Sequence, residues 1–129
     1  PLIIYYLGIG LPPLMLVPDR IRQVFLNLLL NAMDAMPEGG VLAVRTMQSR
    51  KPFGMRVTVR DTGPGIPAAI LERVFEPFYT TKKKGLGLGL FTSRSIIERH
   101  RGTIEVHSRP GQGTTFVVWL PARPEGSDG

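Results

Sequence analysis

Asp61-Thr62-Gly63-Pro64-Gly65-Ile66 and, farther along the chain, Gly85-Leu86-Gly87-Leu88-Gly89-Leu90 are the two segments from which this sequence is interpreted. Glycine lets a backbone approach a ligand closely and adopt positive φ. The second segment runs into an amphipathic helical pattern, and the free amides at the start of a helix suit phosphate. Either segment alone is a weak signal, because glycine-rich turns are common. In this order, behind a helix that carries two asparagines, they predict a nucleotide site.

The surrounding segments predict a mixture of helices and strands. A helix is expected from Arg20 to about Met36, with Asp19 as its N-cap. A short helix is expected over Ala68–Val74 and a long one over Leu88–His100, while Gln48–Gly54 is expected to be the polar loop of a hairpin. Five segments are expected to be strands, of which the second and third show clear alternation: Leu2–Leu7, Val41–Met47, Met55–Asp61, Gly102–Ser108 and Thr114–Leu120. The pattern predicts an α/β fold, a mixed and mainly antiparallel sheet with helices on one face.

Length and composition describe one ordinary globular domain. The chain has 129 residues, of which 43% are apolar and 20% charged. We expect the domain to occupy residues 1–121 and residues 122–129 to form a flexible tail. Cysteine is absent, which excludes disulfides and thiolate metal sites. The apolar stretch Leu2–Val17 is interrupted by glycines and prolines, so we expect no membrane contact by this domain.

The net charge of +6 has two interpretations. A basic surface can bind nucleic acid, but here the basic residues are scattered and few aromatic residues accompany them. A solvated basic face is the preferred interpretation, and no nucleic-acid partner is expected. The densest run, Lys82-Lys83-Lys84, stands directly before the second glycine segment. A polyanionic ligand explains that position better than a nucleic acid does.

Two groups of polar residues are candidates for ligand contacts. Asn27, Asn31 and Asp34 fall within about 60° of one another on the first long helix. This stripe meets water, a partner or a ligand, and asparagine oxygens suit a magnesium ion that keeps phosphate and water ligands. Asp61 ends a strand. It is either a plain turn aspartate or an acceptor for an exocyclic amine such as that of adenine.

Taken together, the motifs resemble those of the catalytic ATP-binding domain of two-component sensor histidine kinases, in the order of that family and over residues 11–121. The N box, first glycine box, F box, second glycine box and last glycine box correspond to Asp19–Ala35, Asp61–Ile66, Phe75–Lys82, Gly85–Leu90 and Gly113–Phe116. The resemblance implies a two-layer α/β sandwich of the Bergerat type, which type II topoisomerases and mismatch-repair ATPases share.

The resemblance also implies ATP and Mg²⁺ as ligands and a role for each matching residue. Asn31 becomes the magnesium ligand and Asn27 its phosphate-side neighbour. Asp61 becomes the acceptor for the adenine amine, assisted by Thr115 through water, and Arg73 is implied to meet the γ-phosphate. Lys82 with the second glycine box is implied to form a lid over the phosphates. The further nucleotide contacts implied are Asp34, Gly63, Gly65, Ile66, Phe78, Thr81, Gly85, Leu86, Gly87, Leu88, Gly89 and Leu90. Phe75 and Phe78 are expected either to pack the base of the lid or to belong to the core.

Three classes of protein compete within this resemblance: a kinase, an ATPase and a domain that only binds nucleotide. In the topoisomerase and mismatch-repair relatives a glutamate at the position of Asn27 activates water, and an amide cannot act as a general base. Hydrolysis as the main activity is therefore disfavoured, and the intact motifs argue against a domain that only binds nucleotide. A serine-phosphorylating anti-sigma kinase shares the fold but usually lacks so full an F box. The resemblance thus implies transfer of the γ-phosphate to a histidine on a separate dimerisation and phosphoacceptor domain, with a response regulator downstream.

Two departures from the family pattern stand out. Arg101 replaces the first glycine of the usual His-Gly-Gly after the second long helix, which is expected to alter a turn but not the site. Neither His100 nor His107 is followed by an acidic residue, so each is expected to be structural or exposed. We therefore expect an excised piece of a longer kinase, with its phosphoacceptor helices upstream. This domain would be cytoplasmic, whether or not the full protein is membrane-anchored.

Overall fold

The computed structural model describes residues 2–6, 14, 16–77 and 89–122. In this part of the chain, strands and helices follow one another in the order that the sequence predicts. The elements are β1 (Leu2–Tyr6), α1 (Pro18–Ala35), β2 (Val41–Arg50), β3 (Phe53–Asp61), α2 (Ala68–Leu71), α3 (Gly89–Arg99), β4 (Thr103–Ser108) and β5 (Thr114–Pro121).

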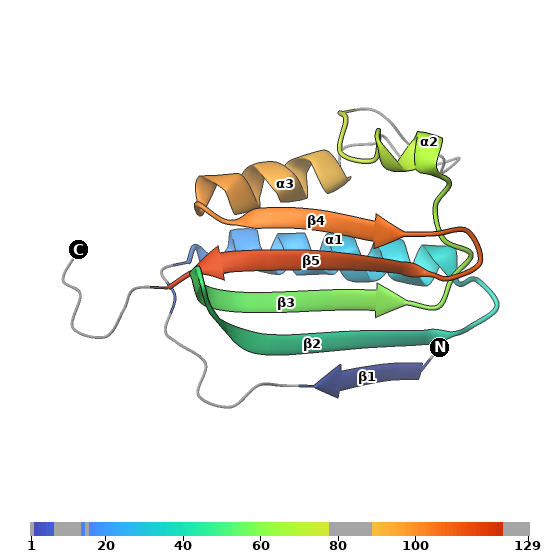
Figure 1. Ribbon diagram of the computed structural model, residues 1–129, viewed down its shortest axis with the longest axis horizontal. Helices are drawn as coiled ribbons and strands as arrows, with labels where there is room; N and C mark the ends of the chain where they lie inside the picture. The colour runs from blue at the N-terminus through green and yellow to red at the C-terminus, as the bar shows by residue number, and fades with distance from the viewer. Residues whose placement is uncertain (1, 7–13, 15, 78–88, 123–129) are drawn as a thin grey trace.

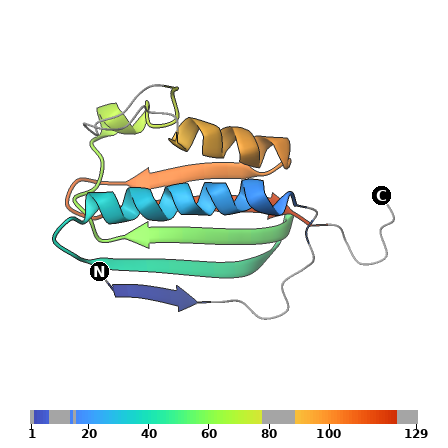
Figure 2. The ribbon, with the colours of Figure 1, turned by 180° about the vertical axis from the view of Figure 1, so that it is seen from behind.

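The strands form one mixed sheet in the order β1-β2-β3-β5-β4. Strand β1 is parallel to β2, and the pairs β2–β3, β3–β5 and β4–β5 are antiparallel. Helix α1 crosses one face of the sheet, and α3 lies beside it on the same side (Figures 1 and 2). The predicted α/β sandwich with a mainly antiparallel sheet is confirmed.

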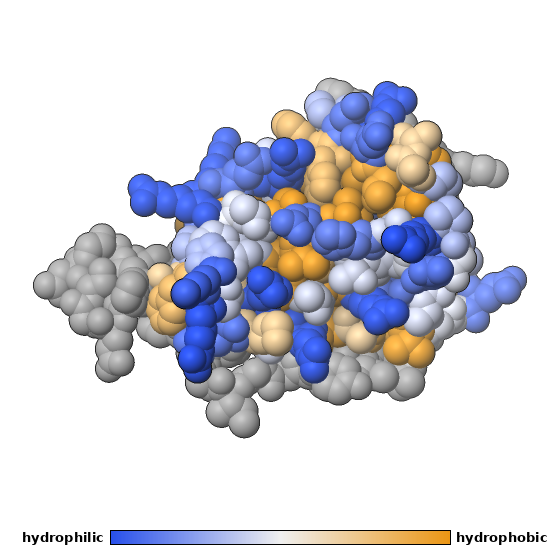
Figure 3. Space-filling view, viewed as in Figure 1, coloured by the Kyte–Doolittle hydropathy of each residue, from blue (hydrophilic) through white to orange (hydrophobic). Residues whose placement is uncertain are grey.

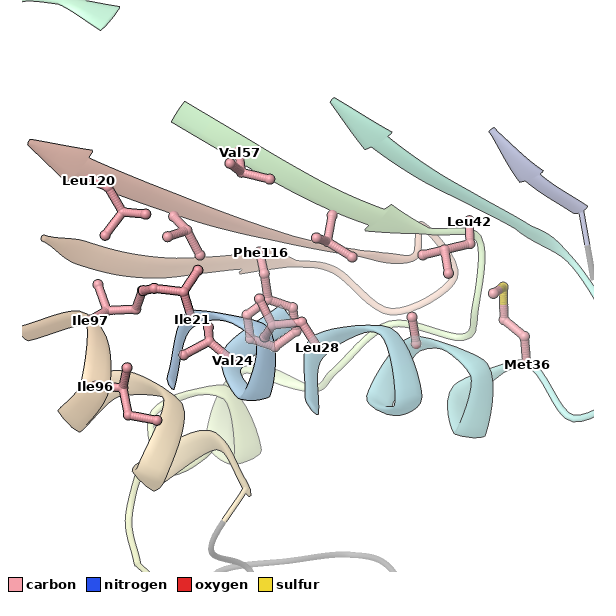
Figure 4. Packing of buried hydrophobic residues seen from close by; sticks show 13 residues of the cluster. Ile21, Val24, Leu28, Met36, Leu42, Val57, Ile96, Ile97, Phe116 and Leu120 are labelled. Atoms are coloured by element: carbon pink, nitrogen blue, oxygen red, sulfur yellow. The ribbon is translucent and has the colours of Figure 1, made fainter. Parts of the chain in front are cut away.

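The core lies between these helices and the sheet. Helix α1 turns a stripe of apolar side chains inward at helical spacing, and Val24 and Leu28 in it have 0% exposure. The facing strands contribute alternate residues, such as Val118 and Leu120 of β5, which are also 0% exposed. Figure 4 shows Val24, Leu28 and Leu120 among the side chains that fill the space between the layers. Burial of this stripe fixes the rotation of α1, and therefore the direction in which its polar residues point.

The start of α1 differs from the prediction. The helix begins at Pro18, and Val17 is its N-cap without a side-chain hydrogen bond, so Asp19 as the N-cap is wrong. Proline suits the first helical position because its fixed φ is helical and it lacks the N–H that would have no partner there. Asp19 lies in the first turn, where it pairs with Arg22 at 2.8 Å.

The hairpin between β2 and β3 is tighter than predicted. The loop predicted over Gln48–Gly54 is wrong, because both strands continue until only Lys51 and Pro52 separate them. The carbonyl of Pro52 accepts hydrogen bonds from Ser49 Oγ at 2.7 Å and from Trp119 Nε1 at 3.3 Å. The first of these bonds satisfies the Ser49 hydroxyl inside the strand ladder, and the second ties the hairpin turn to β5. The sequence pattern alone assigns the segment around Ser49 to a loop.

The helices have other small differences in their bounds. Helix α2 ends at Leu71 and not at Val74, and α3 covers all but the two ends of the predicted Leu88–His100. Within the described ranges, no helix has both the length and the apolar character needed to cross a membrane.

Candidate nucleotide site

The C-terminal half of α1 extends from Gly89, at the start of α3, to Gly63, in the turn after β3. At one end, a Cβ atom on Gly89 would lie 3.9 Å from Cγ of Asn27. At the other, a Cβ atom on Gly63 would lie 3.2 Å from the carbonyl oxygen of Ala35. Asn31 lies midway, roughly 6 Å along the helix axis from each of these α1 residues. The ends of β3 and β4 and the start of β5 meet at the same end of the molecule (Figures 1 and 2).

Asn27 joins α1 to the start of α3. Its Nδ2 donates to the carbonyl oxygen of Gly89 and to Oγ of Ser93, both at 3.3 Å. An amide nitrogen has only two hydrogens, so the carbonyl oxygen is the group that Asn27 has left to offer a ligand. Asn31 is half-buried on the same helix, and Asp34 is exposed.

Asp61 is the buried acidic group of the site. It ends β3 with 5% exposure, and its Oδ1 accepts a hydrogen bond from the backbone N–H of Gly63 at 2.8 Å. Burial raises the pKa of the Asp61 carboxyl above its ordinary 3.8, while hydrogen bonds from the backbone N–H groups of Gly63 and Thr114 partly oppose this. A buried carboxylate with these neighbours is stabilised by any further N–H or O–H donor. This property suits an exocyclic amine.

Glycines allow the turn after β3 to pack directly on the turn between β4 and β5. A Cβ atom on Gly113, where φ is 74°, would lie 2.1 Å from the carbonyl oxygen of Asp61. A Cβ atom on Gly65, where φ is 80°, would lie 2.0 Å from that of Arg109. The backbone N–H of Gly111 donates to the carbonyl of Pro64 at 2.7 Å. Both glycines are therefore required by this packing, whatever ligand binds.

Thr115, predicted to assist at the base through water, lies on the other face of the sheet from Asp61. In the β3–β5 ladder Thr115 pairs with Arg60 on the sheet face opposite α1. Many hydrophilic side chains lie on that face in Figure 3. Its neighbour Thr114 pairs with Asp61 and is 6% exposed. Because side chains alternate across a strand, only one of the two threonines can lie with Asp61. Thr114 stands two positions before the apolar Phe116 and therefore shares its face of the strand. This alternation in the sequence could have identified Thr114.

The described part of the F box has mainly a packing role. The ring of Phe75 lies edge-on to that of Phe116, with 6.4 Å between centroids, and the guanidinium of Arg94 lies 5.5 Å from the Phe75 ring centroid. Of the two roles expected for Phe75, the structure supports the core. Arg73 is exposed and forms an ion pair with Glu76 at 3.1 Å.

The start of α3 carries two of the predicted residues. Gly89 begins the helix, and Leu90 packs partly buried against the core. Several predicted contacts lie outside the described residues: Phe78, Thr81, Lys82, Gly85, Leu86, Gly87 and Leu88.

Comparison with known proteins agrees with this arrangement. Residues 16–124 match the family described as histidine kinase-, DNA gyrase B- and HSP90-like ATPase. Sensor histidine kinase ZraS of Escherichia coli K12 is 46% identical over 111 residues, which are 86% of this chain and 23% of ZraS. The solved catalytic domain of histidine kinase ThkA is 35% identical with a TM-score of 0.79, covering 95% of this chain and 81% of that domain. Full-length ShkA, solved with AMPPNP, is 28% identical with the same TM-score, covering 95% of this chain and 26% of ShkA.

The chain therefore belongs to the family of histidine kinase-, DNA gyrase B- and HSP90-like ATPases. Within that family, its relatives are sensor histidine kinases, and its fold is that of their catalytic domain. The chain spans about a quarter of the length of ZraS, 23%.

Proposed function

We propose that this chain binds Mg-ATP and donates the γ-phosphate to a histidine on a separate dimerisation and phosphoacceptor domain, in two-component signal transduction. The observation that carries the proposal is that Asp61, at the end of β3, lies near one end of the asparagine-bearing half of α1, while the start of α3 contacts its other end at Asn27. The AMPPNP bound to full-length ShkA, which has the same fold, supports the proposal.

Asp61 is the proposed acceptor for the adenine amine. Its carboxyl is buried at the bottom of the turn and already accepts two backbone N–H groups. A donor from the base would bind a lone pair that the carboxylate still offers, whereas a carbonyl oxygen at that point would face it with a second acceptor. Thr114, paired with Asp61 across the strands, replaces Thr115 as the hydroxyl proposed to assist through water.

Asn31 is the proposed protein ligand of magnesium. Among the described residues, no group of three or more His, Cys, Asp or Glu side chains is arranged to hold a metal ion. A site with one amide oxygen fits an ion that takes its other ligands from phosphates and water. Such an ion would offset the negative charge of the phosphates as the γ-phosphoryl group leaves. Asn27 and Asp34 are proposed to contact the phosphate side of the nucleotide through its metal and water shell.

Arg73 and Lys82 are the proposed cationic groups of the transfer. Phosphoryl transfer depends on positioning and on electrostatic stabilisation of the departing group. Lys82, with the second glycine box from Gly85 to Leu90, is proposed to close over the phosphates. Arg73 is exposed two residues before the F box, from where it can approach the γ-phosphate once an acceptor domain is docked.

Hydrolysis is disfavoured as the main activity. Asn27 stands where the hydrolysing relatives have a glutamate, and its amide nitrogen is hydrogen-bonded to the start of α3. An amide neither accepts a proton from water at neutral pH nor changes its charge, so it cannot act as the general base.

The proposal assigns residues 1–121 to one catalytic domain and residues 122–129 to a tail. ATP as the phosphoryl donor implies a cytoplasmic location for this domain. The proposed partners are ATP, the phosphoacceptor domain of the same kinase and a downstream response regulator.

Incubation with labelled ATP tests the proposal. The isolated chain should incorporate almost no phosphate and hydrolyse ATP slowly. Addition of the phosphoacceptor domain of its own kinase should give phosphohistidine on that domain, because transfer needs the imidazole held within roughly 3–3.5 Å of the γ-phosphorus. Rapid multiple-turnover hydrolysis by the isolated chain would contradict the proposal and favour an ATPase.

Arg73→Ala tests the transfer step itself. The variant should lower the transfer rate more than it lowers ATP affinity, because the guanidinium charge matters most as the phosphoryl group departs. Arg22→Ala is the matched control, since Arg22 is also exposed and paired with an acidic residue three positions away. The control should leave both the transfer rate and the affinity unchanged.

A further inference from the structure

Ser108, the last residue of β4, has hydrogen-bond contacts with three partners at the predicted base site. The backbone N–H of Ile66 donates to Ser108 Oγ at 2.8 Å, and Ser108 Oγ donates to the carbonyl of Gly113 at 2.8 Å. Oγ1 of Thr114 is the third partner, also at 2.8 Å. Ser108 thus joins the turn after β3 to the hairpin that carries Thr114.

The donor in each of these bonds follows from the chemistry of the partners. A serine hydroxyl has one hydrogen and two lone pairs. The Gly113 carbonyl can only accept, so it takes the hydrogen of Ser108. The Ile66 N–H can only donate, so it takes one lone pair. Only an acceptor lone pair remains, and Thr114 must therefore donate its hydroxyl hydrogen to Ser108.

The consequence concerns what Thr114 offers to a ligand. Thr114 pairs with Asp61 across β3 and β5, and both side chains are buried on the same face, at 6% and 5% exposure. With its hydrogen directed to Ser108, the Thr114 hydroxyl offers only lone pairs. An ionised Asp61 also offers only lone pairs. The two side chains therefore present acceptors alone, which suits an amine, or a water that donates to both of them.

We propose that Ser108 is a positioning residue that determines base specificity by holding the Thr114 hydroxyl as an acceptor. This inference rests on the proposed function, in which Asp61 receives the base. Without the Ser108 hydroxyl, Thr114 can turn its hydrogen toward the ligand and donate to a carbonyl oxygen, such as O6 of guanine. Loss of Ser108 should therefore reduce discrimination between adenine and guanine, whereas a purely structural role would weaken both nucleotides equally.

Calorimetric titration with Mg-ADP and Mg-GDP tests the proposal through the ratio of the two dissociation constants. The wild type should prefer ADP, and Ser108→Ala should reduce that preference by about tenfold, because a buried donor would then be available for the guanine carbonyl. Ser108→Cys, which keeps the shape but forms weaker hydrogen bonds, should shift the ratio in the same direction and serves if the alanine variant does not fold. An unchanged ratio in a folded variant would overturn the proposal.

A double-variant cycle tests the route through Thr114. Thr114→Val removes the hydroxyl that Ser108 is proposed to hold, so adding Ser108→Ala to it should not change the ratio further. A further change would show that Ser108 acts by another route and would overturn the proposal. Ser49→Ala is the matched control, because Ser49 is a buried serine that donates to a backbone carbonyl at the other end of the sheet. It should keep the wild-type ratio even where it lowers stability.

Asp61→Asn separates the failure of this inference from the failure of the proposed function. If Asp61→Asn leaves the ADP affinity unchanged, the base does not bind at Asp61, and the proposed function loses its base contact. If Asp61→Asn weakens ADP while Ser108→Ala keeps the wild-type ratio, only the role of Ser108 is overturned.

Discussion

At the scale of single residues, the buried Asp61 carboxyl should lower the stability of the folded domain at neutral pH, although it is the proposed acceptor for the base. Burial raises its pKa above 3.8, so the folded state holds this proton more tightly than the unfolded state does. The contribution of Asp61 to the free energy of unfolding should therefore decrease as pH rises from about 3.8 through the raised folded value, and stay low above it. Asp61→Asn should remove this pH dependence. Urea unfolding of the wild type and the variant at several pH values measures it, as the difference between their free energies of unfolding.

The same Asp61→Asn variant should bind ATP more weakly by about 1–3 kcal/mol, because it would present a donor toward the adenine amine. Calorimetry at neutral pH measures this loss. A variant that keeps the pH dependence, or that keeps the ATP affinity, would contradict the corresponding half of the prediction.

Arg101 is a residue whose backbone is strained. It follows α3 with φ of 62°, its N–H donates to the carbonyl of Glu98, and the N–H of Gly102 donates to that of Ile97. This is a Schellman motif with arginine in the left-handed position that glycine usually occupies. Arg101→Gly should stabilise the domain by about 1 kcal/mol, as thermal unfolding would measure. Gly102→Ala is the contrasting control and should destabilise it, since its Cβ atom would lie 2.3 Å from the carbonyl oxygen of Trp119.

At the scale of elements, His100 joins the end of α3 to the start of α1. Its Nδ1–H donates to the carbonyl of Ile96 at 2.8 Å, and its Nε2 accepts the backbone N–H of Val17 at 3.0 Å. His107, in contrast, is exposed and lies near Glu105. Both histidines therefore agree with the expectation that each is structural or exposed.

His100→Ala should destabilise the domain by about 1 kcal/mol, because the Val17 N–H loses its partner. His107→Ala should stay within about 0.5 kcal/mol of the wild type. Chemical unfolding measures both. ATP affinity should change in neither variant, since Val17 lies roughly 21 Å along α1 from Asn31. Equal loss of stability in the two variants would contradict the role of His100.

At the scale of the whole molecule, nucleotide binding and folding are linked. A ligand that binds only the folded state stabilises it by about 2.7 kcal/mol at a hundred times its dissociation constant. Asn31→Ala should change the stability of the nucleotide-free domain little. If it weakens Mg-ATP tenfold, it should also remove about 1.4 kcal/mol of that stabilisation. Thermal unfolding with and without Mg-ATP measures both values.

Removal of the metal is the control for Asn31. With excess chelator, the wild type and Asn31→Ala should gain the same stabilisation from ATP, because the proposed role of Asn31 is through magnesium. A difference that persists without metal would assign Asn31 a direct contact with the nucleotide. A variant that unfolds readily without nucleotide would instead make the polar stripe of α1 structural.

Much of the fold and part of the site followed from local sequence patterns. Helical spacing of apolar residues predicted α1, strand alternation predicted the paired strands, and a strand ending in Asp61 before a glycine turn indicated the base contact. These features depend on residues a few positions apart, so the sequence by itself carries them. The order of the motifs then indicated the family to which the chain belongs.

Other features were decided only by the tertiary structure. Strand pairing, and not the glycine-threonine motif, places Thr114 and not Thr115 beside Asp61. The contact of Ser108 with Ile66 joins residues 42 positions apart, and the bond from Val17 to His100 joins residues 83 positions apart. The register between strands and the packing of helix ends set these contacts, because they depend on how distant segments meet. A hydroxyl's role as donor or acceptor follows from those neighbours, which no local pattern of residues contains.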